Sequence, residues 1–167
     1  MNLSLQYPTE EERCWQLMDE LHDPEIPVLS LSDMGVVRSI QIQSPPEEDG
    51  IVTVTITATY TACPAMDMIA AMIKMELQTK GYKQVNIVNS ISPAWTTDWM
   101  SEKGKQKLKE YGIAPPDKRF TIPYDGIPCP QCGSENTRLL SEFGSTACKS
   151  LLQCRECGEP FDYFKCH

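Results

Sequence analysis

The chain has 167 residues, 41% of them hydrophobic and 23% charged, and its formal net charge is −8 at pH 7. A chain of this length can build one ordinary hydrophobic core and a small second domain. The acidic balance argues against nucleic acid as a partner, because phosphate backbones are bound by clustered Lys and Arg. Neither a signal peptide nor an apolar run of membrane length is visible, so we expect a cytoplasmic protein with no membrane contact.

The first predicted element is an amphipathic helix at residues 9–22. A capping-box pattern opens it, and apolar residues follow at helical spacing. Residues 23–35 contain prolines and show no periodicity, which predicts an ordered loop. This loop carries three acids, Asp23, Glu25 and Asp33.

Residues 36–43 and 51–57 predict an antiparallel hairpin, because turn residues separate them and the second run alternates between apolar and hydroxyl side chains. A helix is expected between Pro64 and Gly81, since Pro fits the first helical position and Gly the position after the end. A strand at 85–91 would complete a right-handed crossover and pair in parallel. The predicted fold class is an α+β or α/β domain with a small mixed sheet, in the order α-β-β-α-β.

Residues 92–99 contain two tryptophans, which we expect to pin a loop on the core. A short helix is predicted at 101–111. The Pro115-Pro116 pair and the polar stretch after it indicate a domain boundary, so we expect domains at 1–116 and 117–167.

The second domain contains two C-x-x-C pairs, and such turns direct two sulfurs toward one point. The pattern predicts a zinc ribbon with a structural Zn²⁺ bound by Cys129, Cys132, Cys154 and Cys157. An iron–sulfur centre also takes four thiolates. A pair of disulfides is a third interpretation, which a reducing cytosol disfavours.

Two further cysteines of this domain lie outside the pairs. If the second pair is the tip of a hairpin, Cys148 and Cys166 face each other across it to within a residue or two. We predict that they are neighbours. They would be a redox-sensitive dithiol, a second metal half-site with His167, or two ordinary packed thiols.

Cys63 lies between the second strand and the following helix, where we expect it to be the N-cap. The helix dipole would then lower the pKa of its thiol and favour a thiolate that binds a soft metal or attacks a disulfide. The other interpretation is a small buried hydrophobe. Asp23, Glu25, Asp33 and Asp67 are candidate supporting acids, although each also fits a structural role in a turn or at a helix start.

Three motifs resemble the signature of a known family, Asp23-Pro24-Glu25, Asp33-Met34-Gly35-Val36-Val37 and Thr61-Ala62-Cys63-Pro64. They look like the small iron–sulfur assembly domain of SufT-type and cytosolic iron–sulfur targeting factors, over roughly residues 9–91. Met34, where many relatives have Leu, is a conservative departure. The resemblance implies an α/β fold and iron or cluster handling at the cysteine.

Residues 92–99, 112–116 and 142–149 resemble more narrowly the PaaD family of phenylacetate-degradation proteins, and this resemblance covers nearly the whole chain. It implies a place in aerobic phenylacetate catabolism. There a multicomponent oxygenase forms the ring epoxide of phenylacetyl-CoA at a di-iron centre and draws electrons through an iron–sulfur reductase. The family is named as a component of this phenylacetyl-CoA epoxidase.

We therefore expect an accessory or maturation factor for the iron centres of the oxygenase, without catalytic activity of its own. Cys63 would bind iron or an iron–sulfur cluster transiently, and the ribbon would be a docking platform. The expected partners are other epoxidase subunits or iron–sulfur assembly proteins, and a homo-oligomer is compatible with the sequence. The alternative is a stoichiometric structural or regulatory subunit. A thiol oxidoreductase is a weaker interpretation, because Cys63 lacks a C-x-x-C partner.

Overall fold

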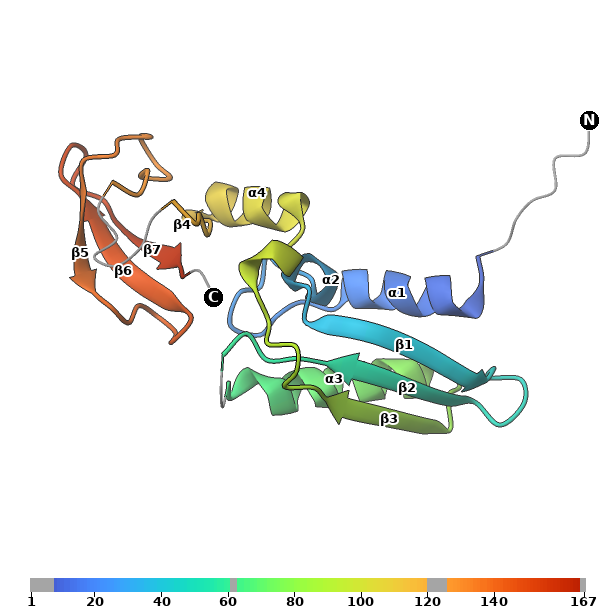
Figure 1. Cartoon of the computed structure of the whole chain (residues 1–167). Helices are drawn as coiled ribbons and strands as arrows, with labels where there is room; N and C mark the ends of the chain where they lie inside the picture. Colours follow the sequence, from blue (N-terminus) through green and yellow to red (C-terminus); the bar gives the residue numbers. More distant parts are fainter. Residues whose placement is uncertain (1–7, 61–62, 120–125, 166–167) are drawn as a thin grey trace, which may run out of the picture.

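The computed structural model describes residues 8–60, 63–119 and 126–165. Figure 1 shows two units in chain order: a three-stranded sheet with helices packed on it, and a four-stranded sheet that closes the chain. In these described ranges, no helix is long and apolar enough to cross a membrane.

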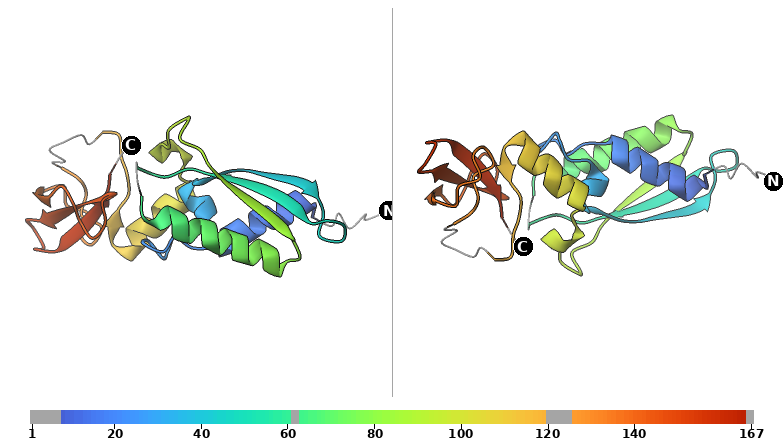
Figure 2. Two further views of the ribbon diagram at one scale, coloured as in Figure 1. Left: turned by 90° about the horizontal axis from the view of Figure 1, so that it is seen from below. Right: turned by 90° about the horizontal axis from the view of Figure 1, so that it is seen from above.

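The sheet of the first unit consists of β1 (Val37–Ser44), β2 (Ile51–Ile56) and β3 (Gln84–Asn89). β1 pairs antiparallel with β2, and β2 pairs in parallel with β3, so the predicted mixed sheet is confirmed. Helices α1 (Glu10–Glu20) and α3 (Ala65–Thr79) lie together on one face of it (Figure 2).

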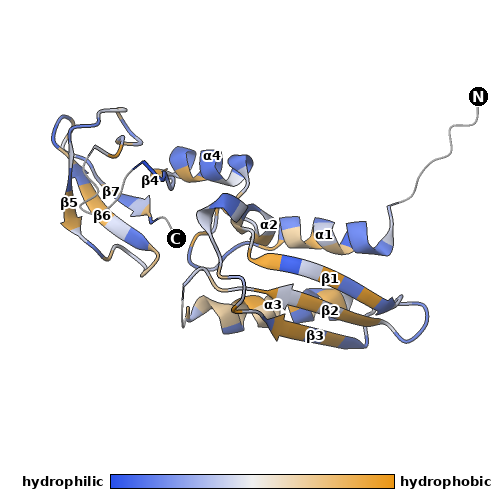
Figure 3. Ribbon diagram, in the orientation of Figure 1, coloured by the Kyte–Doolittle hydropathy of each residue, from blue (hydrophilic) through white to orange (hydrophobic). Residues whose placement is uncertain are grey.

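The alternating pattern of β2 explains which face the helices cover. Val52, Val54 and Ile56 are fully buried, whereas the threonines between them are only partly covered. Strands of period two direct every second side chain to the same face, so this hydrophobic row meets the helices. Figure 3 shows the apolar residues concentrated on β2, β3 and α3.

Helix α3 starts one residue later than predicted. Pro64 occupies the N-cap position and the helix begins at Ala65, so the prediction that Cys63 is the N-cap is wrong. The buried stripe is present at Ile69, Ile73 and Leu77.

The loop expected at 23–35 contains a short helix, α2 (Leu31–Met34), which corrects the prediction. The hydroxyl of Ser30 caps it by accepting the N–H of Asp33, and Gly35 ends it with a φ of 66°. A helix of four residues is too short to show an apolar period, which is why the pattern did not reveal it.

The segment after β3 carries the short helix η1 (Thr97–Trp99) and then α4 (Glu102–Tyr111). Trp95 is buried in the core and its Nε1 donates to the carbonyl oxygen of Met34 at 3.0 Å. Trp99 is half-buried beneath the guanidinium of Arg38, which lies 3.5 Å from the ring centroid. The prediction that the two tryptophans pin this segment on the core is confirmed.

The second unit is a four-stranded sheet in the order β4-β7-β6-β5. Its strands are β4 (Ile113–Ala114), β5 (Thr137–Ser141), β6 (Lys149–Cys154) and β7 (Pro160–Phe164). β4 follows α4 directly and pairs in parallel with β7, so the two residues before Pro115 belong to this sheet. The domain limits at residues 116 and 117 stay a prediction.

The two units share a buried interface. Cys148 and Phe164 of the second unit belong to the hydrophobic core of the first, and the ring of Phe164 lies 6.1 Å from that of Trp95. A second, smaller apolar cluster lies within the ribbon around Leu152 and Tyr163. The second sheet is therefore packed against the first unit.

Candidate functional site

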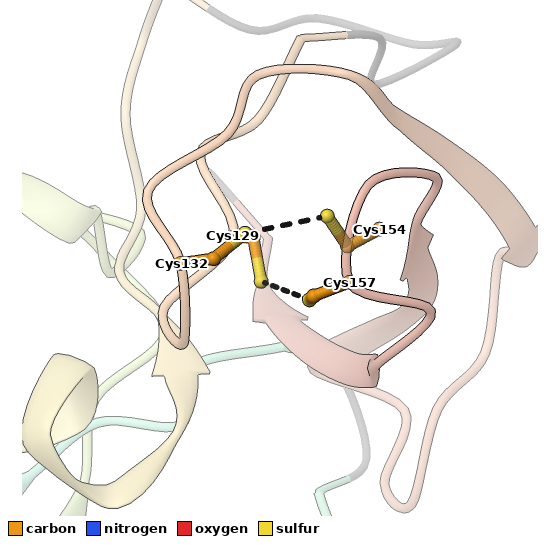
Figure 4. Close-up of side chains that lie close together, drawn as sticks. All are labelled: Cys129, Cys132, Cys154 and Cys157. Carbon is orange, nitrogen blue, oxygen red and sulfur yellow. Dashed lines mark hydrogen bonds between the residues drawn. The ribbon is translucent and has the colours of Figure 1, made fainter.

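The four cysteines of the two C-x-x-C pairs form one cluster. Their sulfur atoms all lie within 4.8 Å of one another, with 3.8 Å between Cys129 and Cys157 and 3.6 Å between Cys132 and Cys154 (Figure 4). A tetrahedral metal with bonds of about 2.3 Å holds its sulfur ligands about 3.8 Å apart. The sulfurs therefore fit a single ion of the size of Zn²⁺.

The two turns that present these sulfurs have the same backbone structure. In each, the N–H of the first cysteine, Cys129 or Cys154, donates at 2.9 Å to the carbonyl oxygen five residues later. Gly133 and Gly158 close the turns with φ of 76° and 80°, in the left-handed region that favours glycine. Because the turns are alike, each delivers its two sulfurs in the same way.

Backbone N–H groups donate to the sulfurs of Cys132, Cys154 and Cys157, although the neighbouring cysteines and burial leave the pKa of Cys132 and that of Cys157 raised. The N–H groups of Cys157 and Glu156 help to lower the pKa of Cys154 to about 7. Such donors stabilise thiolates, the form that binds metal. The predicted four-cysteine cluster is confirmed, and the identity of its metal stays a prediction. Four thiolates leave the metal no open position, so this group is suited to a structural role.

Cys63 lies half-buried just before α3. Its sulfur accepts hydrogen bonds from the N–H of Ala65 and from the hydroxyl of Tyr60. Burial raises the pKa of the Cys63 thiol, the carboxylates of Glu25 and Asp23 raise it further, and the two hydrogen bonds oppose this rise without reversing it. The N–H of Ala65 at the start of α3 thus lowers the pKa of Cys63, but burial outweighs it, so the expected net lowering is wrong.

Asp23 and Glu25 both act electrostatically on Cys63. Asp23 is buried, and its Oδ1 accepts the N–H groups of Glu25 and Ile26 at 2.8 Å each. Burial also raises the pKa of Asp23 and that of Glu25. Asp23 thus caps a turn, one of the two roles expected from the sequence, and its role as a supporting acid of Cys63 stays a prediction.

The other two candidate acids have structural contacts. Asp33 accepts the hydroxyl of Ser101 at 2.6 Å and forms an ion pair with Lys107, which ties α2 to α4. Burial alone would raise the pKa of Asp33, but Lys107 and Ser101 outweigh it and the pKa is lowered. Asp67 is exposed in the first turn of α3.

The ribbon adds two residues to the surroundings of Asp23 and Glu25. Cys148 is 3% exposed and Lys149 is 4% exposed. Burial raises the pKa of Cys148, and Glu25 and Asp23 contribute to the rise, while the charge of Lys149 opposes the rise in the pKa of the two carboxylates without reversing it. Figures 1 and 2 show the ribbon at the end of the first unit where α3 begins. No local pattern could indicate this meeting, because it joins segments far apart in the chain.

Cys166 and His167 lie outside the described part of the chain. The predicted pairing of Cys148 with Cys166 and a contribution of His167 therefore fall on residues that the structure does not describe. In the described part, the N–H of Lys165 donates to the carbonyl oxygen of Cys148 at 3.0 Å. The pairing of β6 and β7 thus extends as far as Cys148. The proposed neighbour pair stays a prediction.

Comparisons with known families match both units. Residues 11–88 match the family described as "Iron-sulfur cluster assembly protein", and residues 115–165 match the family described as "PaaD zinc beta ribbon domain". The first match runs from α1 to β3, and the second includes β5, β6 and β7.

Two curated relatives match at different lengths. The chain is 43% identical over 162 residues to a subunit of the "Putative 1,2-phenylacetyl-CoA epoxidase" of Escherichia coli (strain K12), and the match covers 95% of this chain and 94% of that protein. It is 36% identical over 99 residues to an "Fe-S protein maturation auxiliary factor" of Porphyromonas gingivalis (strain ATCC BAA-308 / W83), over 59% of this chain and 90% of that protein.

A solved structure has the same fold as the first unit. The domain of unknown function DUF59 from Bacillus anthracis superposes with a TM-score of 0.52 and 22% identity, and covers 59% of this chain and 90% of that one. At this identity the likeness concerns the fold alone.

Proposed function

The chain belongs to the PaaD family of phenylacetyl-CoA epoxidase subunits, and from this premise we propose that it is a maturation factor for the iron centres of that epoxidase. In this role it would help to install or repair iron and would catalyse no step of the epoxidation. The match of the first unit to an iron–sulfur assembly family supports the proposal, as does the name of the shorter relative.

The observation that carries the proposal is the placement of Cys63. Its half-buried sulfur has two hydrogen-bond donors that stabilise negative charge, and the carboxylates of Asp23 and Glu25 act on it. Sulfur and carboxylate oxygen together suit a borderline cation such as Fe²⁺. The four-cysteine cluster has no free coordination position for a transferred iron ion. The cluster would therefore have the structural role, and the Cys63 site would have the role in transfer.

The ribbon would provide the contact with the epoxidase. It exposes two large hydrophobic side chains, Leu140 at 46% and Phe143 at 64%. A partner that docks on the ribbon would be held next to the Cys63 site, because the ribbon packs against the same end of the first unit.

Co-expression tests this function. The remaining epoxidase subunits are produced with the wild-type chain, with Cys63→Ser, or without the chain, and the iron content and turnover of the purified oxygenase are measured. We expect both to fall strongly with Cys63→Ser and without the chain. Cys14→Ser is the matched control, because that thiol is buried on α1 next to the Tyr82 hydroxyl. Full iron loading in the absence of the chain would overturn the proposal.

The longer relative is named as a subunit of the epoxidase itself, which favours a second function, that of a stoichiometric structural or regulatory subunit. This function needs no chemistry at Cys63. It predicts that the chain purifies in a fixed ratio with the oxygenase and that activity survives Cys63→Ser but not deletion of the ribbon. The same co-expression series therefore separates the two.

A further inference from the structure

We propose that the free edge of β3 is a homodimer interface, at which β3 of one copy of the chain pairs antiparallel with β3 of a second copy. The two three-stranded sheets then form one continuous sheet across a two-fold axis. This inference goes beyond the proposed function and needs no chemistry at Cys63.

On one side of β3, the backbone has no partner strand among the described residues. β3 is the last strand in the order β1-β2-β3 (Figure 1). The N–H groups of Gln84 and Ser90, at the two ends of the pairing, donate to carbonyl oxygens on the β2 side at 3.0 and 2.8 Å. Hydrogen-bonding direction alternates along a strand. The N–H and C=O groups that point to the free edge are therefore those of Val85, Ile87 and Asn89.

β3 lacks the features that keep the edges of natural sheets from pairing. Such features are charged side chains, proline, bulges and very short strands. At the other ends of the two described sheets, β4 has only two residues, β1 carries Arg38 and two register shifts, and β5 carries Arg138 and one register shift. β3 contains neither charge nor proline, and its pairing with β2 has no shift. Of these four end strands, β3 is the one that is open to a further strand.

Exposed apolar side chains accompany this edge. Val88 of β3 is 46% exposed, and Ile91, just after the strand, is 92% exposed. Met68 and Met75 are also exposed on α3, the helix that packs on β3. Addition of a strand to β3 would remove part of this apolar surface from water, which favours association.

The symmetry of the edge matches a second copy of the chain. The outward backbone groups are arranged evenly about Ile87. A two-fold axis at this residue pairs Ile87 with its own counterpart and Val85 with Asn89, so each outward N–H meets a C=O. On the face away from the helices, Asn86 then lies opposite Val88 of the second copy.

The charge of the chain also favours this contact between two copies. A net charge of −8 makes the copies repel each other, so their association is favoured at a surface without charge. Asn86 and Val88 are uncharged, and so are Thr53 and Thr55, their partners on β2. A strongly charged partner would find no counter-charge on this strand.

Sedimentation and amide exchange of the full chain, with zinc bound to the ribbon, test the interface. We expect the wild type to sediment with the mass of two chains, against 18.8 kDa for one. The amides of Val85, Ile87 and Asn89 should be protected in the dimer and lose this protection on dilution. Those of Asn86 and Val88 should stay protected in both states, because they bond to β2.

Charge placed on the edge should separate the copies. Val88→Glu puts two carboxylates on a diagonal across the axis and should shift the chain to the monomer. Adding Asn86→Lys to this variant places an ammonium opposite each carboxylate and should restore the dimer, a rescue that depends on the register around Ile87. Gln41→Glu is the matched control, because it adds the same charge to the same face on β1 and should leave the dimer intact.

Unchanged zinc content and an unchanged unfolding midpoint verify that each variant is folded. Asn89→Pro is the second variant, because it removes an outward N–H and no hydrogen bond to β2. A wild type that is monomeric at every concentration, or a dimer that persists in both Val88→Glu and Asn89→Pro, would overturn the inference. A monomer that binds the remaining epoxidase subunits, and loses this binding with Val88→Glu, would also overturn it and assign the edge to a strand of another protein.

Discussion

Asp33 connects two helices through a single side chain. Its carboxylate forms an ion pair with Lys107 of α4 and accepts the hydroxyl of Ser101, the N-cap of α4. Asp33 is 5% exposed. We expect Asp33→Asn to lower the free energy of unfolding by about 1–3 kcal/mol, because hydrogen bonds to a buried charged group are lost. Urea denaturation measures this change. Asp67→Asn, which alters an exposed acid of α3, should cost less.

The stabilisation by Asp33 depends on pH in a defined direction. The pKa of Asp33 is lowered in the folded protein, so its contribution is complete above the pKa of the unfolded chain, about 3.9. The contribution is lost as the pH falls through the folded pKa. The difference between wild type and Asp33→Asn should therefore shrink from pH 7 to pH 3 in chemical denaturation, whereas a difference that stays constant would contradict the ion-pair account.

Single residues also show what sequence reasoning can find. Cys63 was predicted as the functional thiol from the resemblance of its motif to an iron–sulfur assembly family, since its place before a helix left a packed thiol equally open, and its function stays a prediction. The sign of its pKa shift was predicted wrongly, because burial and neighbouring acids depend on tertiary structure. The helix dipole follows from residues next to each other in the sequence. Desolvation of the thiol depends on segments that are distant in the sequence.

At the scale of elements, Gly35 at the end of α2 lies close to Trp99 of η1. A Cβ at this glycine would lie 2.3 Å from the carbonyl oxygen of Trp99, and φ is 66°. Gly35→Ala therefore combines a backbone clash with backbone strain. We expect it to lower the free energy of unfolding by about 1–3 kcal/mol or more. Thermal unfolding measures the loss.

Gly112→Ala is the matched control for this substitution. Gly112 also has a positive φ, 93°, but nothing lies within 4 Å of the added Cβ. The difference between the two variants isolates the clash with Trp99. Equal losses would show that the close approach of the two elements contributes nothing.

The elements with long periodic patterns were predictable, and the short ones were not. β2 alternates over six residues and α3 keeps its apolar stripe over four turns, so both were predicted close to their observed bounds. α2 and β4 are too short to show a period. The four-cysteine cluster was predictable for a different reason, because its geometry is local to two similar turns.

At the scale of the whole molecule, the ribbon contributes two residues to the core of the first unit. Cys148 and Phe164 look like ribbon residues in the sequence, yet they are buried against Trp95 and its neighbours. Nothing in a local pattern says which distant surface a strand will meet. The contact between the two units therefore had to come from the structure.

This shared core predicts that the metal of the ribbon also stabilises the first unit. A small metal domain unfolds when its ion is removed. Removal by a strong chelator under reducing conditions should therefore lower the melting temperature of the first unit by about 5 °C or more, since a loss near 1 kcal/mol has that effect.

Tryptophan fluorescence monitors this melting, because Trp15, Trp95 and Trp99 all lie in the first unit. Readdition of zinc should restore the original midpoint. A first unit that melts at the same temperature with and without metal would show that the two units are energetically independent.

Iron transfer between purified proteins tests the central claim most directly. The chain is loaded anaerobically with ⁵⁷Fe²⁺ and mixed with iron-free oxygenase in the presence of a chelator that captures free iron, and the ⁵⁷Fe in the oxygenase is measured. The account predicts that the wild-type chain fills the oxygenase and restores its activity, and that Cys63→Ser does not. Equal filling by Cys63→Ser would contradict a role of this thiol in iron delivery.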